Sequence, residues 1–358
     1  MNENTWYSID EKVMSMYRQY CVKANEAHYR KLFRQNGLKV RKLTGVQKKE
    51  INDLWKGKVR DFSTHEFYYT VTGEYNPLVC SEMLFRKDLE PMFNNQNLKR
   101  AWGDKNYLER FVPGAPFPHA YLRAVGGGGQ TNYYDENDRL ITKEAAVRIL
   151  KGLERFVIKP SIDNGLGKGV KICEAGCDID ALFNTYKSDF VVQEVIRPHS
   201  SIAKFGPKAA GIFRVTTCRM SGASRFLSAS LPINEADVPN DNYISKDGRG
   251  MVVIGANNDG VLKNKGYYSC GVAIEQSANG ETFGGTVIPS FELMKETVVR
   301  ASEKLGHFGF AGWDVTIDQN EKPVILEYNI RAPGVLYYQY TTGPLFGEYT
   351  DEIIRTLL

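Results

Sequence analysis

Two short apolar runs near the C-terminus stand on either side of a polar stretch. They cover residues 313–317 and 324–330, and the stretch between them, 318–323, reads Asp-Gln-Asn-Glu-Lys-Pro. Short apolar runs around such a turn signal predict a β-hairpin with a longer loop. We therefore expect two paired antiparallel strands in this part of the chain.

Polar side chains interrupt these predicted strands in a regular way. Successive strand residues point to opposite faces, so Glu327, Asn329 and Arg331 share one face, and Asp314 on the neighbouring strand can face the same side. Strands disfavour Asp, Glu and Asn, whereas their oxygens suit Mg²⁺, which takes one or two carboxylates and completes its shell with water and nucleotide phosphate. The pattern predicts a metal site at Asp314, Glu327 and Asn329. The alternative is a hairpin with one polar, solvated face.

Periodic patterns elsewhere predict a chain of helices and strands. Apolar residues at three- and four-residue steps predict helices over residues 10–35, 44–55, 142–150 and 291–305, and a further helix opens at 103–107. Thr44 and Thr142 stand at N-cap positions. Strands are expected over residues 67–71, 119–125, 155–160, 170–172, 190–196, 212–217 and 226–231, and residues 232–285 read as long surface loops around short strands.

A glycine-rich loop follows the predicted strand 155–160. The strand carries Lys159, and residues 161–169 read Ser-Ile-Asp-Asn-Gly-Leu-Gly-Lys-Gly before the partner strand begins. Glycines let a backbone close onto phosphate oxygens, and a lysine adds a point charge, so this unit is a candidate phosphate lid. The alternative is a long hairpin with an exposed lysine. A second glycine run, 126–129, is read as a flexible turn because no Lys-Ser or Lys-Thr follows it.

Composition narrows the class of protein. A length of 358 residues suggests two or three domains, and a net charge of +4 is too small to argue for nucleic acid. No apolar run approaches the ~18 residues of a membrane span, and the N-terminus has no apolar signal segment. The six cysteines lack zinc spacing and are read as reduced thiols, with a Cys173–Cys177 redox or metal pair as the alternative. We expect a cytoplasmic protein without a membrane span.

Five features, taken in order, resemble the ATP-grasp superfamily over roughly residues 101–335. They are Gly103-Asp104-Lys105, Lys159 with its glycine loop, the segment Gln193-Glu194-Val195-Ile196, Arg214, and Asp314 with Glu327-x-Asn329-x-Arg331. The N-terminal helices and the segments 45–51 and 329–334 look like the sugar-transfer-associated branch, which is linked to cell-surface polysaccharide biosynthesis. The resemblance implies an α+β ATP-grasp fold, with two α+β subdomains gripping ATP between antiparallel sheets and a helical N-terminal region.

The resemblance also implies a division into three parts. Residues 1–100 would form the N-terminal helical or mixed region, residues 101–192 the ATP-grasp lid subdomain, and residues 193–358 the C-terminal catalytic subdomain. ATP would bind between the second and third parts.

The resemblance further implies roles for the residues that would bind ATP. Lys105 and Lys159 would hold the α- and β-phosphates, and the lid would cover them with Ser161, Asn164, Gly165, Gly167 and Gly169. Gln193 and Glu194 would meet the adenine amino group, and the backbone at Val195 and Ile196 would read the ring edge. His199 stands where the family often places an acidic residue for the ribose.

The metal and catalytic roles follow from the same resemblance. Asp314, Glu327 and Asn329 would carry one or two Mg²⁺ ions, with Mn²⁺ as an alternative. Arg214 and Arg331 would stabilise the transferring phosphoryl group or the substrate carboxylate, together with Lys159. Many ligases of the family carry an arginine two residues before the first metal aspartate, where this chain has Gly312.

The activity that the resemblance implies is an ADP-forming ligase. A carboxylate would attack the γ-phosphate of ATP, and an amine would then displace phosphate from the acyl phosphate. The substrates would be a small-molecule carboxylate and an amine or sugar-linked compound, such as a polysaccharide precursor or an amino acid. One alternative is a kinase of the same fold that acts on a sugar or other hydroxyl. A second is a non-catalytic nucleotide-binding module, or a nucleic-acid-binding one that uses the basic N-terminal helix.

Overall fold

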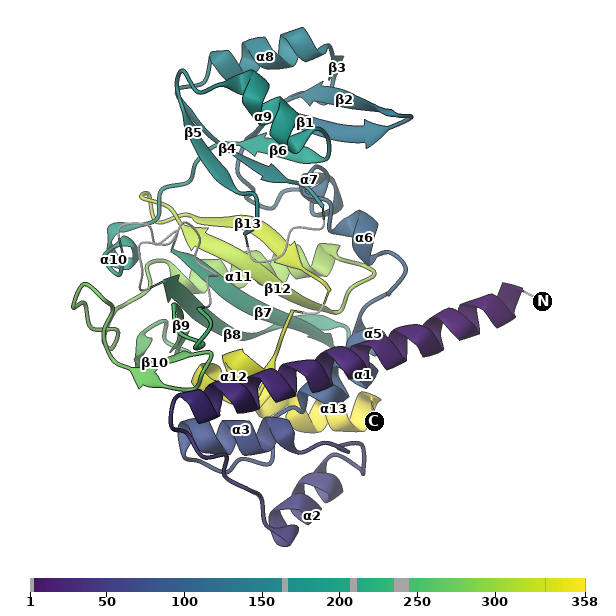
Figure 1. Cartoon of the computed structure of the whole chain (residues 1–358), viewed down its shortest axis with the longest axis vertical. Coiled ribbons are helices and arrows are strands. Elements are labelled where there is room, and N and C mark those ends of the chain that lie inside the picture. The colour runs from purple at the N-terminus through teal and green to yellow at the C-terminus, as the bar shows by residue number, and fades with distance from the viewer. Residues whose placement is uncertain (1–2, 163–166, 207–210, 235–244, 332, 358) are drawn as a thin grey trace.

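A seven-stranded antiparallel sheet forms the centre of the molecule (Figure 1). The computed structural model describes residues 3–162, 167–206, 211–234, 245–331 and 333–357. The strands of this sheet are β7 (Ile212–Met220), β8 (Ala223–Asn234), β9 (Met251–Ala256), β10 (Leu262–Tyr268), β11 (Ala273–Ile274), β12 (Phe310–Ile317) and β13 (Pro323–Asn329). Their order is β11-β10-β9-β8-β7-β12-β13, so the predicted hairpin forms one edge.

The hairpin β12–β13 is confirmed, and its register decides which residues meet. Asp314 lies directly opposite Glu327, and Gly312 lies opposite Asn329, with a register shift between Asp314 and Val315. On its other side β12 pairs with β7, and this pairing sets Asp314 opposite Arg214. Three charged residues are thereby brought side by side on three adjacent strands.

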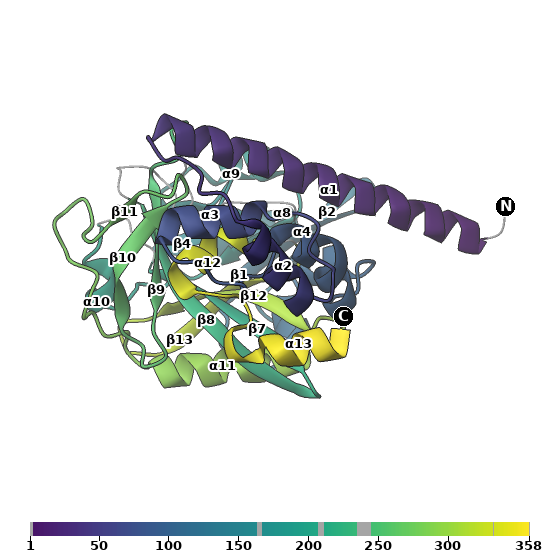
Figure 2. The same ribbon diagram turned by 90° about the horizontal axis from the view of Figure 1, so that it is seen from below.

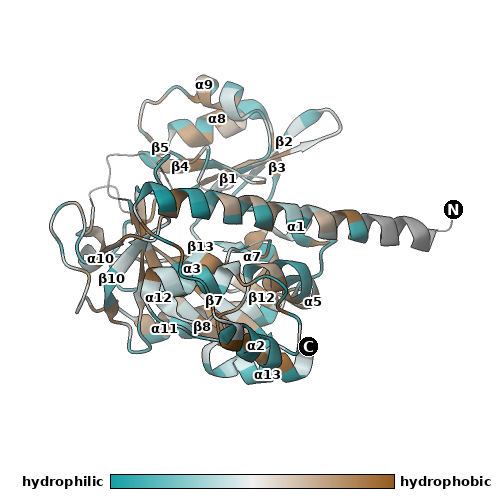
Figure 3. Cartoon of the chain, turned by 60° about the horizontal axis from the view of Figure 1, so that its bottom comes forward, coloured by the Kyte–Doolittle hydropathy of each residue, from teal (hydrophilic) through white to brown (hydrophobic). Residues whose placement is uncertain are grey.

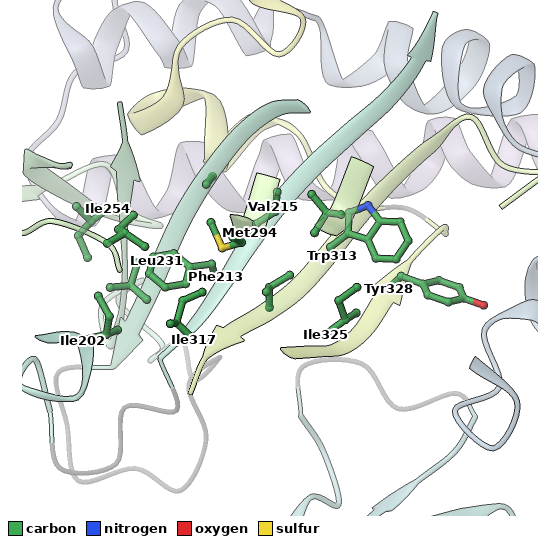
Figure 4. Close-up of a cluster of buried hydrophobic side chains, with 14 of the residues drawn as sticks. Ile202, Phe213, Val215, Leu231, Ile254, Met294, Trp313, Ile317, Ile325 and Tyr328 are labelled. Carbon is green, nitrogen blue, oxygen red and sulfur yellow. The ribbon is translucent and has the colours of Figure 1, made fainter. Parts of the chain in front are cut away.

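Helices cover both faces of this sheet (Figure 2). Helix α11 (Phe291–Lys304) packs on one face, and its Met294 joins Phe213, Val215 and Trp313 in the largest core cluster (Figure 4). Helix α12 (Leu336–Thr342) covers the opposite face with helices of the N-terminal region. Since burying one large apolar side chain is worth about 1.5–3 kcal/mol, these two layers fix the sheet on which the site is built.

A six-stranded antiparallel sheet forms the second half of the fold. Its strands are β1 (Ala120–Gly127), β2 (Gln130–Asp135), β3 (Leu140–Ile141), β4 (Arg155–Pro160), β5 (Lys171–Glu174) and β6 (Phe190–Gln193), in the order β3-β2-β1-β6-β4-β5. Helices α8 (Lys143–Lys151) and α9 (Ile179–Tyr186) pack against it and share its own core cluster. Thr142 caps α8 as predicted, because its side chain accepts a hydrogen bond from the backbone of Ala145.

The N-terminal region is helical, as expected. It comprises α1 (Glu3–Gln35), α2 (Gly45–Leu54), α3 (Ser63–Thr72), α4 (Glu82–Leu84), the π-helix η1 (Phe85–Leu89), α5 (Glu90–Phe93), α6 (Lys99–Trp102) and α7 (Leu108–Phe111). A capping box between Thr44 and Gln47 starts α2. Three further short helices, α10 (Ser200–Ala203), η2 (Gly347–Tyr349) and α13 (Thr350–Leu357), complete the described elements.

The strand predicted over residues 67–71 is wrong, because this stretch lies inside helix α3. Phe67 and Tyr68 are both buried there, next to Phe33 of α1 and Tyr337 of α12. The aromatic and β-branched residues that suggested a strand are buried between helical neighbours instead.

Helix α1 extends past the rest of the chain at its N-terminal end (Figure 3). Several apolar side chains whose spacing predicted this helix are exposed: Met16 and Tyr20 are 70% and 71% accessible. Its C-terminal half packs on the body through Leu32 and Phe33, which are fully buried. Among the described residues, no helix has the length and apolarity that crossing a membrane requires.

Candidate nucleotide and metal site

Two carboxylates and one amide from the two strands of the hairpin meet, and all three residues are half-buried. Asp314 comes from β12, and Glu327 and Asn329 come from β13. The amide nitrogen of Asn329 donates to Asp314 Oδ2 at 3.2 Å. Asp314 and Glu327 lie opposite each other in the register, so the three predicted metal ligands do converge.

Three cations surround this carboxylate pair. The Arg214 guanidinium donates from Nε to Asp314 Oδ1 at 2.7 Å, and Lys105 Nζ lies 3.2 Å from Glu327 Oε2. Lys159 Nζ donates to the backbone carbonyl of Leu326 at 3.4 Å, one residue before Glu327. Lys159 reaches the site from β4 of the six-stranded sheet, whereas Arg214 belongs to β7 of the seven-stranded one. The two sheets therefore contribute cations to the same point.

Burial and mutual charge perturb these groups. Burial raises the pKa of Asp314, and the negative charge of Glu327 adds to this, although Arg214 opposes it. Burial also acts to raise the pKa of Glu327, but Lys105 and Lys159 outweigh it and lower that pKa. For Lys159, burial is the main cause that lowers the pKa to about 8. Ionisable groups with perturbed pKa values that gather in one cavity are typical of functional sites.

Arg214 is held on several sides. Burial acts against its charge, but Asp314 more than offsets this, and the pKa of Arg214 is raised. Its Nη1 donates to the carbonyl of Pro333 at 3.3 Å, and the guanidinium lies 5.4 Å from the ring centre of Tyr338. A Cβ atom on Gly312 would come within 3.1 Å of Arg214 Cδ. The space beside Asp314 is thus filled by an arginine from the neighbouring strand.

The donor set fits a magnesium ion. Two adjacent half-buried carboxylates repel each other, and a divalent cation between them would relieve this repulsion further. Glu327 and Asp314 would hold the ion, and the Asn329 amide lies beside Asp314 to complete the protein ligands. Among the described residues, no group of three His, Cys, Asp or Glu side chains is placed to hold a metal ion.

A cavity of about 220 Å³ lies between the two sheets next to this pair. Its walls are mostly apolar and come from both sheets: Pro118, Val157, Gly167, Val170, Ile172, Val195, Ile196, Ile212, Thr316 and Leu326, with Lys159, Gln193, Glu194, Asp314 and Glu327 as its charged and amide members. A flat aromatic base suits such apolar walls, and the charged end suits phosphates.

Gln193 offers a polar atom to a ligand in this cavity. Its Nε2 donates to the carbonyl of Pro118 at 3.4 Å, whereas its Oε1 is buried and has no hydrogen-bond partner among the described residues. Orphaned buried acceptors are costly unless a ligand or water pairs with them. An exocyclic amino group would supply the missing donor.

Of the other residues predicted to contact adenine or ribose, three line this cavity and one does not. Val195 and Ile196 line the cavity, and so does Glu194, whose Oε1 accepts from the backbone of His119 at 2.8 Å. His199 is not among the lining residues. It caps α10 by accepting from the backbone of Ser201, and its Nε2 lies 3.9 Å from Glu321.

The predicted lid residues are only partly described. Gly167 lines the cavity, and Gly169 lies against Pro160 and accepts a hydrogen bond from Tyr186. Ser161 is fully buried, and its carbonyl accepts from the backbone of Lys105 at 2.9 Å. Asn164 and Gly165 lie outside the described residues. The contact of this loop with phosphates stays a prediction.

A second cavity of about 290 Å³ adjoins the first, and Glu327 lines both. Its members include Lys105, Asn329 and Arg331, all predicted as site residues, and also Lys99 and Arg100 of α6. The side chain of Arg331 thus lies in the second cavity, whereas Arg214 stands beside Asp314.

Sequence reasoning missed two sets of residues. Lys99 and Arg100 belong to a short helix without a motif, so no signal marked them. The apolar wall residues could have been predicted in part. Val157 lies two residues before Lys159 on the same strand, so the two side chains share one face of the sheet.

One comparison matches part of the chain to a known family. The family model described as sugar-transfer associated ATP-grasp matches residues 177–350, slightly less than half of the 358 residues. This segment is therefore similar to the sugar-transfer-associated ATP-grasp family, in agreement with the resemblance seen in the sequence. Lys105 and Lys159 lie before the matched segment.

Several solved structures are similar to the chain at low sequence identity. ATP-grasp ligase PsnB complexed with minimal precursor is 14% identical over 76% of this chain and 67% of that chain, with a TM-score of 0.40. An L-amino acid ligase from Bacillus licheniformis is 15% identical over 73% and 49%, with a TM-score of 0.39. N5-carboxyaminoimidazole ribonucleotide synthetase from Thermotoga maritima is 14% identical over 73% and 50%, with a TM-score of 0.40.

The chain spans about half the length of the last two proteins. A search among curated proteins finds no match.

Proposed function

We propose that the chain is an ATP- and Mg²⁺-dependent, ADP-forming ligase that joins a carboxylate to an amine. The observation that carries this proposal is the position of Glu327. It lines both cavities, faces Lys105 at 3.2 Å and lies opposite Asp314. A phosphoryl group moving between the two cavities would pass this point.

The cavity between the sheets is the proposed ATP site. Its apolar walls accept the base, Gln193 Oε1 accepts from the adenine amino group, and Lys159 and Lys105 face the phosphates. In phosphoryl transfer, positioning and neutralisation of charge do most of the work. Two lysines and an arginine around one carboxylate pair provide this neutralisation.

Asp314 and Glu327 are the proposed magnesium ligands, with Asn329 beside them. When bound, the ion supplies positive charge that draws together the phosphate oxygens and the carboxylate pair. Arg214 orients Asp314 and opposes the rise in its pKa, and Lys105 orients Glu327 and lowers its pKa.

The proposed reaction has two steps. A carboxylate oxygen of the acid attacks the γ-phosphorus, the bond to the β-bridging oxygen breaks, and ADP leaves with its electron pair. An amine then attacks the carbonyl carbon of the acyl phosphate, phosphate departs, and the amine loses a proton. Burial of the site between two sheets limits hydrolysis of the acyl phosphate.

The substrates are proposed from the family description. A sugar-transfer-associated family points to a carboxylate or amine on a polysaccharide precursor, or to an amino acid joined to one. The protein would act in the cytoplasm, where ATP is available.

Isotope transfer tests the chemistry directly. The chain is incubated with Mg²⁺, ATP, an amine panel and acids labelled with ¹⁸O in the carboxylate. We expect ADP and inorganic phosphate carrying one ¹⁸O atom, and only when both an acid and an amine are present. Phosphate retained on a sugar hydroxyl would identify a kinase instead. ATP binding without ADP formation across the panel would favour a non-catalytic module.

A further inference from the structure

The two cavities that meet at Glu327 differ sharply in charge. The cavity between the sheets has mostly apolar walls. The second cavity is lined by four cations, Lys99, Arg100, Lys105 and Arg331, against the single carboxylate of Glu327. The Tyr328 and Leu108 side chains add apolar surface. A hollow of about 290 Å³ with this charge is suited to a small anionic molecule.

The N-terminal region supplies much of this positive charge. Helix α6 brings Lys99 and Arg100 to the edge of β13, and Tyr328 fixes this contact by donating from its hydroxyl to the carbonyl of Trp102 at 2.6 Å. Lys99 is buried and paired with Glu90, so its charge is partly neutralised. Arg100 and Arg331 are both exposed.

Further charged groups stand behind this wall. The cationic side chains of Arg18 and Arg86 act on Lys99. Glu82 lies 4.0 Å from Arg86, and its carboxylate also accepts from the backbone of Val335 and Leu336. Glu82 and Glu90 are therefore both paired, and the cations that line the cavity outnumber its one carboxylate.

We propose that the second cavity binds the acid substrate, and that this acid carries a second anionic group held by Arg100 and Arg331. The reacting carboxylate would lie beside Asn329 and Glu327, where the two cavities join. This inference rests on the proposed function and adds a substrate class to it: a small dianionic acid whose second charge is a carboxylate or a phosphate. It also gives the N-terminal region a role in selecting the substrate.

A binding experiment tests the second charge. The protein is saturated with Mg²⁺ and ADP, and then titrated with butyrate, succinate or 3-phosphonopropionate. We expect one of the two dianions to bind at least about tenfold more tightly than butyrate, and the better of them identifies the second group. Equal affinities for all three acids, or no binding of either dianion, would overturn the proposal.

Arg100→Gln is the decisive variant, with Arg300→Gln on α11 as a matched control. Both residues are exposed arginines on helices, and Arg300 is not among the residues that line either cavity. Arg100→Gln should remove most of the preference for the dianion and leave ADP affinity unchanged, whereas Arg300→Gln should change neither. A preserved preference in Arg100→Gln would refute the assignment. Loss of ADP binding in the unmodified protein would instead count against the proposed function.

Discussion

Asp314 and Glu327 are neighbours whose charges repel, and each is stabilised by a different cation. Arg214 pairs with Asp314, and Lys105 pairs with Glu327. This arrangement leaves two carboxylates side by side between fixed positive groups, and it explains why strongly polar residues are retained within apolar strands. At the scale of single residues, the site depends on which cation faces which carboxylate.

Replacing Glu327 by Gln should abolish most turnover without unfolding the chain. The substitution keeps the shape but removes the charge that faces Lys105 and Lys159. Losing one preorganised electrostatic partner typically costs ~100-fold or more in rate. ADP formation should therefore fall by about two orders of magnitude, with Glu303→Gln on α11 as the control. Unchanged ADP formation in Glu327→Gln would remove this residue from the metal site.

Gly312→Ala should impair catalysis through Arg214. The added methyl would stand 3.1 Å from Arg214 Cδ, so the arginine must shift away from Asp314. We expect roughly a tenfold lower kcat, with ADP affinity nearly unchanged because the cavity for the base is not altered. The control is Gly306→Ala, where a methyl would meet no atom within 4 Å. Equal turnover in both variants would show that Arg214 does not need its present position.

The sequence predicted the residues of this site better than their contacts. The alternation in β12 and β13 was enough to place Asp314, Glu327 and Asn329 together. It could not show that the Arg214 side chain packs against Gly312, because this contact depends on the pairing of β7 with β12. Nor could it show that His199 caps a helix, because the spacing of residues does not reveal local hydrogen bonds.

At the scale of elements, helix α3 joins the N-terminal region to the large sheet. Its Phe67 and Tyr68 share a cluster with Met251 and Val253 of β9. A pattern of aromatic and β-branched residues favoured a strand here, but burial between α1 and α12 outweighs that local preference. The helices starting after Thr44 and Thr142 were predicted correctly, because a cap is a local signal that tertiary packing did not oppose.

Helix α3 should also make the fold sensitive to acid through His65. Burial lowers the pKa of His65 to about 4, although backbone groups of Pro77 and Val79 partly oppose this. The unfolded chain binds the proton more readily, so the stability that neutral His65 provides is complete above pH ~6.5 and is lost as the pH falls toward 4.

Urea unfolding at pH 7 and pH 5 measures this effect. His65 should account for a loss of about 2 kcal/mol between these pH values. Glu26 acts in the opposite direction, because burial raises its pKa to about 6, so the comparison is made between variants. His65→Leu should lose less stability on acidification than the unmodified chain, and the exposed His28→Gln should match the unmodified chain. An identical pH response in His65→Leu would rule out His65 as the source.

At the scale of the whole molecule, the two sheets have separate cores. The cluster of the six-stranded sheet contains only residues between 121 and 192, whereas the clusters of the large sheet combine residues from both ends of the chain. The N-terminal region thus packs with the large sheet, although it precedes the six-stranded sheet in sequence. Among the described residues, Lys159 of the six-stranded sheet donates a hydrogen bond to Leu326 of the large one.

A nucleotide between the sheets should therefore slow the opening of the smaller sheet more than that of the larger one. Val157 and Ile172 line the cavity from the small sheet, and Ile212 and Leu326 line it from the large one. A ligand at 100 times its Kd stabilises the bound form by about 2.7 kcal/mol, or roughly 100-fold in exchange rate. Hydrogen exchange with and without Mg²⁺ and ADP should show this slowing in β4 and β5.

Peptides from β8 and β9 serve as the internal reference in the same samples, because these strands lie in the large sheet and contribute no residue to the cavity lining. Slowing confined to β4 and β5 would mean that the six-stranded sheet opens as a unit of its own and that the nucleotide closes it onto the hairpin. Equal slowing in all four strands would mean that the molecule opens only as a whole. In that case the mixed cores at the two ends of the chain would have to hold the six-stranded sheet as firmly as they hold the large sheet, and the six-stranded sheet could not admit ATP by moving alone.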